Sequence, residues 1–196
     1  MLKYYDYLSQ VAAEQLKSLI GQTLISIIAP QIITSPLESA DEYVAPWICI
    51  ALRGDQKNQY LNLCEERCET AAEYDYHQLK LSLSDEAANI SAYFSFETLD
   101  VTHPPASLMV EKRIHAIKVF RVFIDSEMES IQSDCIIRFD LSDEKSILIY
   151  PESCGQFVST GMITVVFGWH DVDFPARPRV SASIDRPVRV EEVLAI

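Results

Sequence analysis

The stretch 135–150 reads Cys-Ile-Ile-Arg-Phe-Asp-Leu-Ser-Asp-Glu-Lys-Ser-Ile-Leu-Ile-Tyr. Two apolar runs rich in isoleucine flank a polar connection, Ser142 to Lys145. β-Branched and aromatic residues on both sides of a short polar segment are typical of two antiparallel strands joined by a turn. We therefore predict a β-hairpin here.

A second hairpin of the same kind is predicted at residues 47–63, where the polar connection 53–58 separates Trp-Ile-Cys-Ile-Ala-Leu from Gln-Tyr-Leu-Asn-Leu. A strand-like segment precedes each hairpin, 23–29 in one case and 114–124 in the other. Another follows each, 78–83 and 162–167, and residues 79–83 alternate as Leu-Lys-Leu-Ser-Leu. This order predicts two pseudo-duplicated β units with a period of about 85 to 90 residues, or one continuous domain.

The first twenty residues follow a different pattern. Apolar side chains recur at three- and four-residue intervals from Leu2 to Ile20, and Gly21 follows them. This spacing predicts one amphipathic helix. The expected fold class is therefore α+β, with the N-terminal helix packed on a mainly antiparallel β-sheet. The segment from Glu65 to Tyr76 is compatible with a short helix or with a bulged connection.

Two adjacent prolines, Pro104 and Pro105, mark the best candidate boundary, because proline cannot donate a ladder hydrogen bond. The predicted organisation is a helix plus β unit at 1–100, a Pro-containing connection at 101–110 and a second β unit at 111–196. No strand order follows from the sequence.

The composition limits the classes of function. The chain has 196 residues and a net charge of −13, which opposes binding to nucleic acid and to anionic lipid. No apolar run is long enough to span a membrane as a helix, and no secretory signal is visible. We expect a cytoplasmic protein whose five cysteines are reduced.

Known catalytic and cofactor motifs are not found. The five glycines form no phosphate-binding loop, and the four histidines have no zinc-binding spacing. Two enzymatic alternatives stay open: a Cys154/His170 arrangement with Asp171, and a metal site built on Cys64 and Cys68 if that segment is helical. We expect no cofactor and no metal.

The acidic side chains are unevenly distributed, because residues 1–100 have a net charge of −9 and the rest −4. If they bind a partner, the candidate residues are the acids and the aromatic–imidazole pair at Asp125, Glu127, Glu129, Asp143, Glu144, Trp169, His170 and Asp171. A second acidic group consists of Glu65, Glu66, Glu69, Glu73 and Asp75. The role of the basic side chains near the C-terminus is open: Arg177, Arg179, Arg186 and Arg189.

The sequence favours a non-catalytic acidic module that binds a basic protein, most concretely an immunity or antitoxin protein that inhibits a basic toxin such as a nuclease. One alternative is a self-associating structural module, in which exposed tyrosines from Tyr4, Tyr5 and Tyr7 meet a second copy. The other is an enzyme with an unrecognised site.

Overall fold

Twelve strands in the described part of the chain join into one sheet. The computed structural model describes residues 1–29, 33–36, 41–54, 57–71, 75–86, 106–152, 162–169 and 188–196. In chain order, the elements are β1 (Leu2–Asp6), α1 (Gln10–Ser18), β2 (Thr23–Ala29), β3 (Ile33–Pro36), β4 (Asp41–Ala45), β5 (Trp47–Arg53), β6 (Asn58–Glu69), β7 (Asp75–Ser84), β8 (Ala106–Asp125), β9 (Glu129–Leu141), β10 (Lys145–Glu152), β11 (Met162–Trp169) and β12 (Val188–Ala195).

The strand order is β3-β4-β11-β10-β9-β8-β2-β5-β6-β7, with β12 on β8 and β1 on β9. It contains two antiparallel meanders of four strands, whose first strands pair with each other: β8-β9-β10-β11, and β2-β5-β6-β7, in which β3 and β4 intervene along the chain between β2 and β5. Both predicted hairpins are confirmed. The segments thought to correspond between the two halves occupy equivalent places in these meanders; a duplication of sequence stays a prediction.

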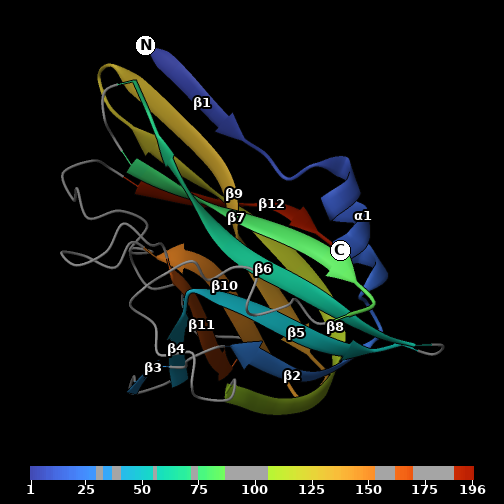
Figure 1. Ribbon diagram of the computed structural model, residues 1–196. Coiled ribbons are helices and arrows are strands. Elements are labelled where there is room, and N and C mark those ends of the chain that lie inside the picture. The colour runs from blue at the N-terminus through green and yellow to red at the C-terminus, as the bar shows by residue number, and fades with distance from the viewer. Residues whose placement is uncertain are drawn as a thin grey trace.

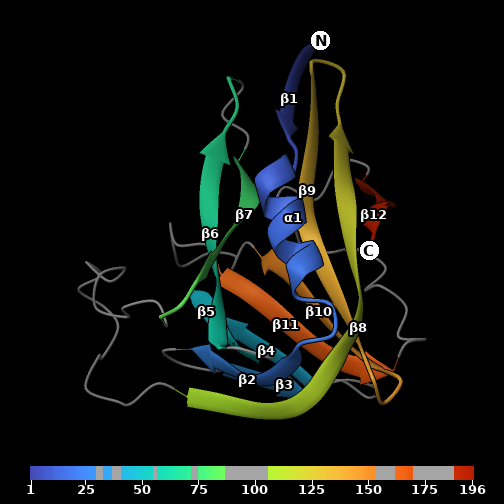
Figure 2. The same ribbon diagram turned by 90° about the vertical axis from the view of Figure 1, so that its right-hand side faces the viewer.

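The long strand β8 connects the two meanders. Its residues 106–113 pair with β2 and its residues 114–125 pair with β9. Shortly before this change of partner, Glu111 has a φ of 51°, at a bulge where β8 has one more residue than β2. Figure 2 shows β8 curving from the base of the molecule into the upright layer that contains β9.

This curvature makes the sheet fold over on itself into two layers. β5, β6 and β7 lie in front of β10 and β11 in Figure 1, and β7 contacts β9 and β10 while β6 contacts β11. The facing side chains are apolar and almost fully buried, including Ile50, Leu61 and Leu63 from one layer and Phe139 and Ile149 from the other. Burial of these side chains is the main force that holds the layers together.

The expectation of an α+β fold with a long N-terminal helix packed on the sheet is wrong, because the described residues are mostly antiparallel strands with a single short helix. Residues 2–6 are a strand, β1, which pairs in parallel with β9. Aromatic residues favour strands, and β1 is stabilised by its hydrogen bonds to β9. A short helix, by contrast, is only marginally stable without tertiary packing. The helix begins only after Ser9, whose side chain accepts a hydrogen bond from the Ala12 amide.

The helix α1 has nine residues and covers the space between β7 and β9 (Figure 2). Its one fully buried side chain is Leu16, and Leu19 is buried just after it. In the described ranges, no helix combines the length and apolar character needed to cross a membrane.

The ambiguous segment 65–76 is extended on both sides: β6 continues to Glu69 and β7 begins at Asp75. Residues 101–105 of the predicted connection lie outside the described residues, and residues 106–110 begin β8. The division into domains stays a prediction, although the sheet takes strands from both halves of the sequence.

Replacement of Glu111 by glycine tests the strained bend in β8. A positive φ costs a residue with a Cβ atom roughly 1 to 2 kcal/mol, and glycine in a strand loses roughly 0.5 to 1 kcal/mol through entropy. Glu111→Gly is therefore expected to leave the free energy of unfolding unchanged or raise it by about 1 kcal/mol, measured by urea denaturation. The control Lys112→Gly should lower it, and equal losses in both variants would contradict the strain.

Candidate functional site

The structure divides the predicted partner-binding acids into two groups. Asp125 ends β8 and Glu129 begins β9, with Glu127 in the turn between them. Asp143 and Glu144 lie in the next turn, after the thirteen residues of β9. At roughly 3.3 Å per residue, β9 separates the two turns by about 40 Å, so the acids do not form one site.

Glu129 is unsuited to contact a partner, since only 1% of its surface is exposed. The Thr70 hydroxyl donates a hydrogen bond to its Oε2 at 2.9 Å, and the Tyr4 hydroxyl approaches its Oε1 at 3.4 Å. Tyr4 in turn accepts a hydrogen bond from the Ala71 amide at 2.8 Å. These contacts make Glu129 a structural link between β1, β9 and the end of β6.

The other acids of this set differ in their exposure to solvent and in whether a described side chain binds their carboxylate. The Asp125 carboxylate accepts a hydrogen bond from the Ser130 hydroxyl at 2.7 Å, and Asp143 forms an ion pair with Lys112 at 3.3 Å. Glu127 and Glu144 are exposed in their turns. The turn between β8 and β9 therefore presents Asp125 and Glu127 to solvent.

The second acidic group is largely paired. Glu65 is buried against His77, and Glu66 binds Lys80 at 3.1 Å, while Glu69 is exposed at the end of β6. Glu73 and the side chain of Asp75 lie outside the described residues.

The aromatic and imidazole candidates are only partly covered by the structure. Trp169 ends β11, where its backbone pairs with Lys145. His170, Asp171 and Cys154 lie outside the described residues, as do Arg177, Arg179 and Arg186. Arg189 lies on β12, with its guanidinium carbon 3.9 Å from the centre of the Phe123 ring and an ion pair to Glu191.

The hypothetical metal site at Cys64 and Cys68 assumed a helix, but both residues lie on the strand β6. Four residues of strand span about 13 Å, too far for two thiolates to bind one zinc ion. Within the described ranges, no three His, Cys, Asp or Glu residues gather closely enough to hold a metal. Burial, followed by nearby glutamates, raises the pKa of both thiols, which disfavours the nucleophilic thiolate at neutral pH.

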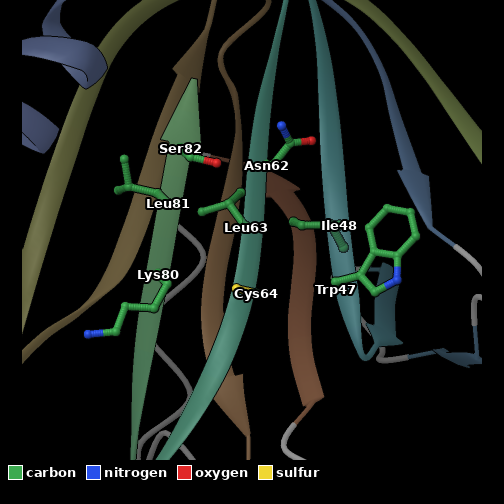
Figure 3. A pocket seen from close by; sticks show the side chains of 8 residues that line it. All are labelled: Trp47, Ile48, Asn62, Leu63, Cys64, Lys80, Leu81 and Ser82. Carbon is green, nitrogen blue, oxygen red and sulfur yellow. The ribbon is translucent and has the colours of Figure 1, made fainter. Parts of the chain in front are cut away.

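A shallow pocket lies on the β5–β6–β7 layer (Figure 3). Its volume is about 170 Å³, below the roughly 300 Å³ at which small-molecule sites begin. The lysine at its edge is engaged, since Lys80 binds Glu66 and Gln78. The pocket therefore lacks the room and the free polar groups that a substrate site needs. It is lined by Trp47, Ile48, Asn62, Leu63, Cys64, Lys80, Leu81 and Ser82.

The outward face of β1, β9 and β8 offers a better candidate, which we call the tyrosine face; it consists of Tyr5, Tyr7, Arg121, Gln132 and Asp134. The Tyr5 and Tyr7 rings lie 5.4 Å apart, and the Tyr7 hydroxyl donates a hydrogen bond to Gln132 at 2.7 Å. The Arg121 guanidinium lies 3.8 Å from the centre of the Tyr7 ring and donates to both oxygens of Asp134 at 2.6 and 3.0 Å. Tyr7 is thus fixed, whereas Tyr5 is 53% exposed.

Three apolar side chains are exposed where β1 begins beside the turn between β8 and β9, and we call this group, Met1, Leu2 and Met128, the apolar tip. Their exposed fractions are 71%, 56% and 66%, and the Leu2 amide donates to the Met128 carbonyl at 2.7 Å. Asp125 and Glu127 lie in the same turn as Met128. Exposed apolar side chains with a charged rim are typical of protein-binding surfaces.

Sequence analysis missed the tyrosine face because it read the N-terminus as a helix, in which consecutive tyrosines point in different directions. The signal was present in the alternation of residues 3–7, since a strand places Tyr5 and Tyr7 on one side and Tyr4 on the other.

The inward side of β1 carries Asp6, which accepts a hydrogen bond from the Ser133 hydroxyl at 3.3 Å. Burial raises the pKa of Asp6, and the charge of Lys80 opposes this shift only in part. The folded protein therefore binds a proton at Asp6 more readily than the unfolded chain does.

The Asp6→Asn variant tests this coupling. Because the folded pKa is raised, the contribution of Asp6 favours folding below the unfolded pKa and is lost as the pH rises through the folded pKa. Relative to the original protein, the stability of Asp6→Asn should therefore increase as the pH rises above about 4, measured by urea denaturation at each pH. A stability difference that does not change with pH would contradict the burial of this charge.

Comparisons with known proteins yield no relative: no protein-family model, curated protein or solved structure matches this chain.

Proposed function

We propose that this protein is a non-catalytic module that binds a basic protein partner, and that it acts in the cytoplasm as an inhibitor of the immunity or antitoxin type. The observation that carries the proposal is the apolar tip beside two exposed acids, Asp125 and Glu127. A nuclease toxin is the most concrete partner, because its cationic phosphate-binding surface would accept carboxylates in place of the nucleic acid.

The two parts of this surface have different roles in binding. Methionine and leucine side chains supply apolar area, and methionine adapts to the shape of a partner because its side chain is flexible. The exposed carboxylates and the net charge of −13 attract a cationic protein and speed its association. A surface with both features favours a protein partner over a small ligand.

Three of the described cysteines support a non-catalytic role. Besides Cys64 and Cys68, Cys135 is fully buried in the core, and burial raises its pKa to about 12. Each of these three thiols is therefore protonated at neutral pH and is a poor nucleophile.

The experiment is an affinity pull-down of the tagged protein from its native host, followed by mass spectrometry and by purification of the recovered partner. The proposal predicts a stoichiometric basic protein whose association rate falls between 50 and 200 mM salt. Absence of any basic partner, with only the protein itself recovered, would refute the proposal.

Charge reversal at the tip gives the sharper measurement on that purified partner. Glu127→Lys should slow association roughly threefold or more at low salt, with a smaller effect at high salt, measured by surface plasmon resonance. The matched control is Glu144→Lys, which makes the same charge change in an exposed turn at the other end of β9. An equal effect of both variants would show that net charge alone, and not the tip, governs binding.

A further inference from the structure

The strand β1 has hydrogen-bonding groups that no described strand uses. In its parallel ladder with β9, the Leu2 amide donates to Met128, so the backbone groups of Leu2, Tyr4 and Asp6 point toward β9. The groups of Lys3 and Tyr5 alternate with them and point to the opposite side. Among the described residues, β1 pairs with β9 alone, and Figure 1 shows β1 on the outer side of β9.

We propose that this free edge of β1 binds an extended, basic segment of the partner as an added strand. The inference rests on the proposed function and names the mode of binding. The amide and carbonyl groups of Lys3 and Tyr5 provide two donors and two acceptors in the alternating arrangement that strand addition requires.

The charges around the edge favour a basic segment. Asp125 and Glu127 lie at the turn next to the start of β1. Glu69 is exposed two residues before Ala71, whose amide donates a hydrogen bond to the Tyr4 hydroxyl of β1. Against these three carboxylates, β1 itself contributes one cationic side chain, Lys3.

The exposed ring of Tyr5 adds selectivity for arginine. The neighbouring Tyr7 ring already holds the Arg121 guanidinium at 3.8 Å, which shows that this face accepts a stacked cation. Tyr5 lies beside the free edge with half of its surface exposed, so an arginine that points outward from the added strand can stack on it.

Another strand with a single described partner, β12, is a poorer acceptor. It carries charges of both signs at Arg189, Glu191 and Glu192, all of which are exposed. Charged side chains along an edge strand discourage pairing with another chain. The same sheet therefore protects its β12 edge and leaves the β1 edge open.

The test uses a fluorescent decapeptide of alternating arginine and valine with blocked ends, and a matched peptide of alternating glutamate and valine. Binding is measured by anisotropy, and exchange of individual amide protons by NMR. We expect binding of the arginine peptide only, with exchange at the Lys3 and Tyr5 amides slowed at least about tenfold. Protection at β12 instead of β1 would overturn the inference.

Two variants distinguish the contribution of the Tyr5 backbone to peptide binding from that of its ring. Tyr5→Pro removes the outward amide and leaves the ladder to β9. It should lower the affinity for the arginine peptide at least about tenfold. Tyr5→Thr removes the ring and keeps the amide, and it should weaken binding by only about threefold. Equal weakening would overturn strand addition. If Tyr5→Pro does not fold, Lys3→Pro removes the other outward amide.

The remaining outcomes distinguish this inference from the proposed function. Slowed exchange at Lys3 and Tyr5 that depends on protein concentration without peptide would identify a second copy as the occupant and overturn the inference. Binding of the arginine peptide without protection of β1 would refute strand addition. The proposal that the partner is a basic protein would still stand. If neither the peptide nor any basic protein binds, both proposals fail.

Discussion

The passage of a single strand, β8, through both layers is the constraint on which the rest of the structure depends. Because β2 and β9 pair with consecutive parts of the same strand, the bend at Glu111 brings the two meanders face to face. The bend is held from outside, where the Arg113 guanidinium donates to the Gly21 carbonyl at 2.8 Å. Gly21 has a φ of 83°, so the turn after α1 and the bend in β8 fix each other.

The position of an acidic side chain in this sheet determines whether it is paired or exposed. Those whose side chains are buried are paired, as Glu65 is with His77 and Asp134 with Arg121. Those in the turns beyond the ladders, such as Glu127, are exposed. A high negative charge is tolerated because few carboxylates of the described residues are buried, and those have a hydrogen-bonding partner.

Local patterns were enough to predict the hairpins. The alternation in residues 79–83 and the polar connections at 53–58 and 142–145 depend only on neighbouring residues, and they predicted strands that are present in the structure. The first twenty residues could not be assigned in this way, because β1 pairs with residues more than 120 positions away. The helical spacing of Leu8, Ala12 and Leu16 is real, but it belongs to α1 and to the residues just before it. Likewise, the sequence could not show that Glu129 is buried while Glu127, two residues earlier, is exposed.

The parallel pairing of β1 with β9 has a consequence for biosynthesis. The ribosome adds roughly 5 to 20 residues per second, so a separation of 125 positions leaves the first strand without its partner for about 6 to 25 seconds. During that time Tyr4, Tyr5 and Leu2 belong to a nascent chain that has not yet made the strand on which they will dock. A factor that shields this segment during translation, or slow folding that delays all pairing until β9 emerges, would protect the chain from premature association.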